Sequence, residues 1–163
     1  PLDLAVRVPQ HPVAGRVTGR LDMQRGRPGG AAEEHVGGLK AGVGFQQRRR
    51  GAVQVEADTP ESIFAGTKEL LLEILASNSL TPDDVISVLL TASPDLTSAF
   101  PAAAARQIGF ESVPLLCAVE IDVEGALPRT VRAMATVETS LNRSQIAHIY
   151  LHGAKALRQD IAQ

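Results

Sequence analysis

The chain has 163 residues, of which 44% are hydrophobic and 21% charged, and its formal net charge is -2. This composition is ordinary for a soluble domain with a core, whereas the charge balance disfavours a general polyanion binder and the 3% aromatic content disfavours base stacking on nucleic acid. Cys117 is the lone cysteine, which suits a reducing compartment. The sequence also shows no apolar run of membrane-spanning length and no secretory signal. We therefore expect a cytoplasmic protein that does not bind membranes or nucleic acid.

The first part of the chain differs in composition from the rest. Residues 1–50 hold 9 of the 14 glycines and carry 9 Lys+Arg against 4 Asp+Glu, without sustained hydrophobic periodicity. We therefore predict that residues 1–49 are a disordered or spurious N-terminal extension and that residues 50–163 form the folded domain. Because the sequence begins with Pro1 and not Met, one hypothesis is that this part was translated from a wrong start or in a wrong reading frame. A basic arm at "QQRRR" that touches nucleic acid is the alternative.

The first half of the folded part predicts a strand followed by a helix. Val53 and Val55 alternate with polar residues, as in a half-buried strand. Thr59 and Pro60 then form a helix start signal, and apolar residues recur on one face until Asn78. The sequence "LTPDD" repeats the start signal for a short helical turn.

The second half predicts four more strands. "VISVLLTAS", "VPLLCAVEI" and "TVRAMATVE" are strand-like, a short Ala-rich helix opens at Pro101, and "LNRSQIAHIYL" indicates a turn and a strand before a short tail. We predict an α+β fold with a single mixed sheet of about five strands and helices on one face. Since "VISVLL" and "VPLLC" are apolar on both sides, the other face requires cover, and self-association supplies it most simply.

Two charges interrupt the predicted strands. Glu120 and Arg132 lie in otherwise apolar or small-residue runs, where an unpaired buried charge costs several kcal/mol. Three explanations remain open from the sequence: outward-facing residues on alternating strands, a structural ion pair, or the lining of a polar cavity.

Other candidate residues also have plain structural explanations. Arg106 ends the Ala-rich helix, where a cation suits the helix dipole, and Tyr150 and Cys117 are typical core residues. His148 and His152 have a metal spacing only on a helix, and their segment is strand-like, so we predict no metal site.

Considered together, the arginines indicate a class of ligand. Several are distributed through an acidic domain, and the arginine fork binds carboxylates in bidentate fashion. The sequence contains no Ser-His-Asp order, phosphate loop or CxxC motif. A small dicarboxylate fits this pattern without a strong nucleophile or general base.

The order of residues resembles the AroH-class chorismate mutases over nearly all of the predicted domain. The resemblance is carried by "RGAVQVE", "TPDDVISVLLTASPDLTSAFPAAAAR", "VPLLCAVEIDVEGALPRTVRAM" and "IAHIYLHGAKALRQD". It implies an α+β homotrimer with active sites at the subunit interfaces. It also implies the rearrangement of chorismate to prephenate in phenylalanine and tyrosine biosynthesis, without cofactor or metal.

The resemblance implies roles for the central site residues. Arg50 would hold a substrate carboxylate, and Arg132 would lie beside the ether oxygen. Glu120 and Cys117 would lie near the ring hydroxyl, and Tyr150 would contact a carboxylate. On this interpretation Glu120 and Arg132 need not touch each other.

The resemblance also implies a wall and a lid. Phe100, Ala102 and Arg106 would form the interface wall, with Arg106 at the mouth, and Leu157 and Arg158 would form a C-terminal lid. The sequence departs from the family pattern at "QQRRR", where an alternating apolar start is expected. Two rival hypotheses are a Rid-type (YjgF-like) trimeric ligand binder or deaminase and a noncatalytic structural trimer.

Overall fold

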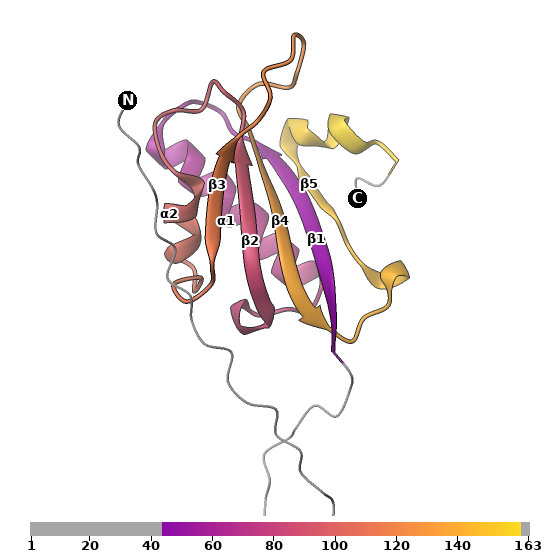
Figure 1. Cartoon of the computed structure of the whole chain (residues 1–163). Helices are drawn as coiled ribbons and strands as arrows, with labels where there is room; N and C mark the ends of the chain where they lie inside the picture. Colours follow the sequence, from indigo (N-terminus) through magenta and orange to yellow (C-terminus); the bar gives the residue numbers. More distant parts are fainter. Residues whose placement is uncertain (1–43, 161–163) are drawn as a thin grey trace, which may run out of the picture. The chain divides into compact units, whose positions relative to one another are not determined.

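A computed structural model describes residues 44–160 (Figure 1). Residues 1–43 of the predicted extension lie outside the described residues, so what was predicted for them stays a prediction. The described elements, in chain order, are β1 (Phe45–Gln54), α1 (Pro60–Ser77), η1 (Pro82–Asp84), β2 (Val85–Ala92), α2 (Pro101–Arg106), β3 (Leu115–Val119), β4 (Thr130–Thr139), η2 (Arg143–Gln145), β5 (Ile149–Leu151) and η3 (His152–Arg158), where η marks a 3₁₀ helix.

The strands form one mixed sheet in the order β3-β2-β4-β1-β5 (Figure 1). β4 is central and antiparallel to both β1 and β2, whereas β3 runs parallel to β2 and β5 runs parallel to β1. β1 and β4 pair from Phe45 opposite Thr139 to Gln54 opposite Thr130. The predicted α+β class with a five-stranded mixed sheet is confirmed.

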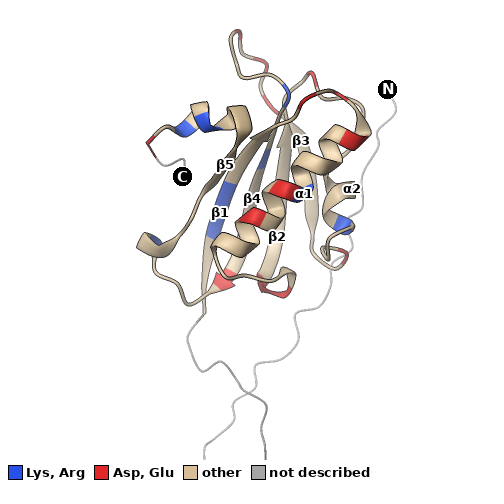
Figure 2. Cartoon of the chain, turned by 180° about the vertical axis from the view of Figure 1, so that it is seen from behind, with Lys and Arg blue, Asp and Glu red and all other residues tan. Residues whose placement is uncertain are grey.

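Helices α1 and α2 cover one face of the sheet (Figures 1 and 2). The Thr59 hydroxyl caps α1 by accepting from the Ser62 amide at 3.2 Å, and Pro60 occupies the first turn, as the start signal predicts. The apolar stripe of α1 lies against alternate residues of the strands. The fully buried members of this core include Ile63, Leu70, Val53, Leu90, Val131 and Val137.

Asn78 and Gly51 position the segment around β5 against α1 and β1. Asn78 is buried, and its side-chain amide donates to the carbonyls of Ile74 at 2.8 Å and Ala147 at 3.0 Å. Its side-chain oxygen accepts from the Ala147 amide at 3.0 Å. Gly51 leaves no room for a side chain, because a Cβ there would lie 2.5 Å from the Ile149 carbonyl oxygen. The segment before β5 is thereby fixed beside β1.

β1 begins at Phe45, five residues before the predicted strand start at Arg50. Arg49 lies on the helix-covered face and is completely buried, although its side chain is charged. Among the described residues, the only hydrogen bond of the Arg49 side chain is from Nη1 to the Gln47 side-chain oxygen at 3.4 Å, and Nε and Nη2 have no partner. Burial lowers the pKa of Arg49 from its ordinary value. A position that alternation predicts to be apolar is therefore occupied by a guanidinium.

The opposite face of the sheet is mostly uncovered, and we call it the open face. Among the described residues, η3 and Leu127 pack on it, where Ala52, Tyr150 and Ala154 form a small second core with Leu127 and Leu157. Apolar side chains elsewhere on this face are left in solvent, with Leu116 65% exposed and Met134 39% exposed. In a single chain this face therefore exposes apolar side chains, as the prediction that it requires cover implies.

Charged residues are unevenly distributed over the elements. Figure 2 shows acidic residues along α1, and basic residues on β1 and on the segment after β5. In the described part of the chain, neither helix is both long and apolar enough to cross a membrane.

Candidate active site

A cavity of about 350 Å³ opens on the open face between β2, β4, β1, β5 and η3. Strand pairing explains how residues distant in sequence meet there. Thr91, Arg132, Ala52 and Tyr150 are consecutive partners across four strands, so their side chains project from the same face. The lining residues are Arg50, Gly51, Leu89, Thr91, Arg132, Ala133, Met134, Tyr150, Leu157 and Arg158.

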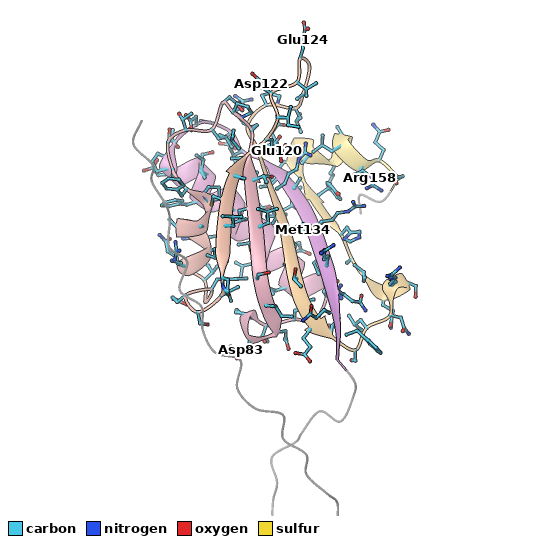
Figure 3. The ribbon with its side chains drawn as sticks, in the orientation of Figure 1. Asp83, Glu120, Asp122, Glu124, Met134 and Arg158 are labelled. Atoms are coloured by element: carbon cyan, nitrogen blue, oxygen red, sulfur yellow. The ribbon has the colours of Figure 1, made fainter. Side chains whose placement is uncertain are left out.

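Five of the ten predicted site residues line this cavity. Arg50 reaches it from β1, Arg132 from β4 and Tyr150 from β5, while Leu157 and Arg158 close one side from η3. Figure 3 views the sheet from this side and shows Met134 in the middle of β4 and Arg158 on the segment after β5. The structure therefore gathers three arginines and a tyrosine around one hollow.

Glu120 and Arg132 contact each other directly. Arg132 Nε lies 3.2 Å from Glu120 Oε1, and the Arg132 side chain remains 45% exposed. Glu120 lies one residue beyond the end of β3, and its amide donates to the Ala92 carbonyl at 2.9 Å. Two of the sequence-based alternatives therefore hold at once, because the ion pair exists and its arginine also lines the cavity.

The same carboxylate oxygen has a second partner that sequence reasoning missed. The Thr91 hydroxyl donates to Glu120 Oε1 at 2.5 Å. Thr91 is on β2, between Ala118 of β3 and Arg132 of β4 in the pairing register. A hydroxyl near the end of the apolar run "VISVLLTAS" was the available signal.

Arg158 is engaged by an acid. Its Nε and Nη2 each donate to one oxygen of Asp160 at 2.8 Å, which is a bidentate pair. The hydrogen bond from Arg158 lowers the pKa of Asp160 to about 2. The predicted lid arginine is thus partly neutralised in this conformation.

His148 is a second residue whose place the sequence did not indicate. Its Nδ1 accepts from the Arg50 amide at 3.4 Å. Burial, followed by the charges of Arg50, Arg49 and Arg158, lowers the pKa of His148, so the ring is neutral at pH 7. The described residues contain no group of three or more His, Cys, Asp or Glu side chains arranged to hold a metal ion.

The other predicted residues lie apart from this cavity within one chain. Cys117 pairs with Leu90, so its side chain projects to the helix-covered side, away from Arg132. Cys117 and Phe100 line a separate hollow of about 350 Å³. Ala102 is buried in α2 and Arg106 is exposed at its end. The structure does not bring these four residues to Arg132, so their role stays a prediction.

Comparison with known proteins gives consistent results. The family model for chorismate mutase type I matches residues 48–161. The chain is 48% identical over 113 residues to chorismate mutase AroH of Thermus thermophilus, covering 69% of this chain and 93% of that protein. It is 45% identical over 114 residues to chorismate mutase AroH of Bacillus subtilis (strain 168), covering 69% of this chain and 90% of that protein.

A solved structure gives the same match in three dimensions. The chain is similar to a chorismate mutase from Clostridium thermocellum with a TM-score of 0.66 and 44% sequence identity. The match covers 68% of this chain and 98% of that one. The shared part therefore corresponds to nearly the whole of the solved protein.

Proposed function

The chain belongs to the type I, AroH-class chorismate mutases, and we propose that the cavity between Arg50, Arg132 and Tyr150 is where it rearranges chorismate to prephenate. The observation that carries the assignment is the cluster of guanidinium groups on the open face. Chorismate is a dicarboxylate, and arginine is the side chain best suited to hold carboxylates in a fixed orientation.

The chemistry requires little of the protein beyond orientation and charge. In chorismate a C–O bond breaks while a C–C bond forms within one molecule, so neither a nucleophile nor a proton acceptor is needed. A protein can accelerate the step by holding the folded conformer and by stabilising the charge that develops on the ether oxygen. The arginine cluster supplies both functions.

Arg132 is proposed as the group that stabilises the ether oxygen. Its Nε is held by Glu120, while among the described residues Nη1 and Nη2 have no hydrogen-bond partner. The two terminal nitrogens are therefore free to donate to substrate. Arg50, exposed on the same face, would hold a carboxylate, and Glu120 would accept from the ring hydroxyl.

The second half of the site is proposed to come from another copy of the chain. Phe100 is 75% exposed and lies in its own hollow with Cys117, away from the arginine cavity. Leu116 on the open face and Val119 beside Phe100 are both uncovered, and these exposed apolar side chains support association between copies of the chain. A homotrimer would cover them and would place Phe100, Ala102, Arg106 and Cys117 of one copy against Arg132 of the next.

The proposed setting is the cytoplasm, where the single cysteine can remain reduced. The rearrangement itself consumes no cofactor. Chorismate and prephenate would be the only small-molecule partners of the site.

A spectrophotometric assay with the purified full chain tests the site. Wild-type protein should remove chorismate absorbance. Arg132→Ala should lower kcat by about 10²- to 10³-fold, as expected when one preorganised donor is lost. Arg143→Ala is the matched control, because Arg143 lies outside this cavity, and it should behave like wild type. Equal activity of the two variants would refute the assignment.

A further inference from the structure

We infer that Thr91 is a positioning residue, which holds the Glu120 carboxylate so that Arg132 presents its two terminal nitrogens to the substrate. The inference rests on the proposed function of the cavity and goes beyond it, because Thr91 acts through Glu120. It starts from one atom, Glu120 Oε1, which accepts both from Thr91 Oγ1 at 2.5 Å and from Arg132 Nε at 3.2 Å.

The register of the sheet makes this arrangement rigid. β3 and β4 are not neighbours, because β2 lies between them. Glu120 must therefore reach across β2 to meet Arg132, and Thr91 is the β2 residue paired with Arg132. The hydrogen bond from the Thr91 hydroxyl thus holds the Glu120 carboxylate in the orientation in which it reaches across β2 to Arg132.

The two oxygens of Glu120 are thereby given different roles. Oε1 is occupied by Thr91 and Arg132, whereas Oε2 has no partner among the residues of the described range. Oε2 is the oxygen left to accept from a substrate hydroxyl. Without the Thr91 bond, the carboxylate could rotate about its terminal torsion, which is broad and roughly two-fold, and exchange the two oxygens.

The same division holds for the guanidinium. A carboxylate that engages Nε alone leaves Nη1 and Nη2 for substrate, whereas a rotated carboxylate can form a bidentate pair that consumes a terminal nitrogen. The side chain of Glu120 is only 20% exposed, so water replaces the lost hydroxyl poorly. Removal of the hydroxyl should therefore disturb the reacting geometry more than substrate capture.

The test is Thr91→Val, which keeps the branched shape and strand preference but removes the hydroxyl. We expect kcat to fall about 10- to 100-fold, the range for losing a hydrogen bond to a charged group, with KM changed less than about threefold. Thr91→Ser restores the hydroxyl and should recover most of the activity. The control is Thr136→Val on β4, whose hydroxyl has no hydrogen-bond partner among the described residues.

A double-mutant cycle shows whether Thr91 works through Glu120. Combining Thr91→Val with Glu120→Gln should cost less than the product of the single effects, because both changes weaken one interaction. Multiplicative losses, no rescue by Ser, or a Thr136→Val effect equal to that of Thr91→Val would overturn the inference. If Arg132→Ala and Glu120→Ala are themselves fully active, the proposed function of the cavity fails. If those two are impaired while Thr91→Val is not, only the positioning role fails.

Discussion

Arg49 and Arg50 are consecutive in the chain and lie on opposite faces of β1. Arg49 is completely buried under the helices, and two of its nitrogens have no hydrogen-bond partner. Arg50 lines the cavity on the open face. Strand alternation thus gives two identical side chains opposite effects, since one destabilises the core and the other serves the site.

The first prediction is that Arg49→Val stabilises the protein. Replacing buried charge by an apolar side chain removes the desolvation cost, which we expect to raise the free energy of unfolding by about 1–4 kcal/mol. Thermal or urea unfolding followed by circular dichroism measures the change. Arg48→Val is the matched control, because Arg48 is exposed on the same strand and its replacement should have little effect. A lower melting temperature for Arg49→Val would contradict the burial of Arg49.

The second prediction concerns Asp160, which holds Arg158 in a bidentate pair. Asp160→Asn should free the guanidinium for a substrate carboxylate and lower KM by about two- to fivefold, with little change in kcat. Because the pKa of Asp160 is lowered to about 2, its carboxylate is ionised at every pH used for assay. The KM difference should therefore persist from pH 5 to pH 9. A KM that rises in Asp160→Asn would indicate that the acid positions Arg158 productively.

The third prediction is a pH dependence of stability at Asp58. Its carboxylate accepts from the amides of Ser98 and Thr97 and from the Thr97 hydroxyl, each at 2.9 Å, and these bonds lower its pKa. A group whose folded pKa is depressed stabilises the fold above its unfolded value and loses that contribution as pH falls through the folded pKa.

Asp58→Ala should accordingly melt at a lower temperature than wild type at pH 7. The difference should shrink as pH falls below 3.8, the ordinary value for this group. Asp83→Ala, a change at an exposed acid outside this network, serves as the control. A difference that grows on acidification would show that the hydrogen bonds to Asp58 do not favour its ionised form.

The fourth prediction concerns the division of the site between copies. Arg132→Ala and Phe100→Asp should each be nearly inactive when prepared alone. When the two variants are co-expressed and assemble at random, about a quarter of the interfaces should join an intact Arg132 to an intact Phe100. Activity should therefore recover to about a quarter of that of wild type. Co-expression of two Arg132→Ala chains is the control. Failure of the co-expressed pair to exceed its parents would argue for a site contained in one chain.

Much of the fold could be predicted, because local signals agree with the tertiary structure. The Thr59–Pro60 cap and the stripe Ile63, Leu70, Ile74 defined α1 closely. β1 was harder, since the glutamines and arginines before Arg50 have no apolar alternation to mark residues 45–49 as a strand. Pairing across the sheet overrides that local pattern, because each residue from Phe45 on has a partner on β4.

The site was only partly predictable for a different reason. Sequence alternation already places Cys117 on the opposite strand face from Glu120, and the structure agrees. The contact between Glu120 and Arg132 depends on β2 lying between their strands, which one sequence does not reveal. Thr91 was missed, and His148 was considered only as a metal ligand, because the contacts of both residues are with neighbours that are distant in the chain.

The most direct test of the central claim replaces Arg132 by citrulline, which keeps the planar shape and most hydrogen bonds but removes the positive charge. If the guanidinium charge stabilises the ether oxygen in the transition state, kcat should fall by about 10²-fold or more while the fold and its assembly are unchanged. The measurement is kcat from the loss of chorismate absorbance at saturating substrate. Near-normal turnover with citrulline at position 132 would contradict the account.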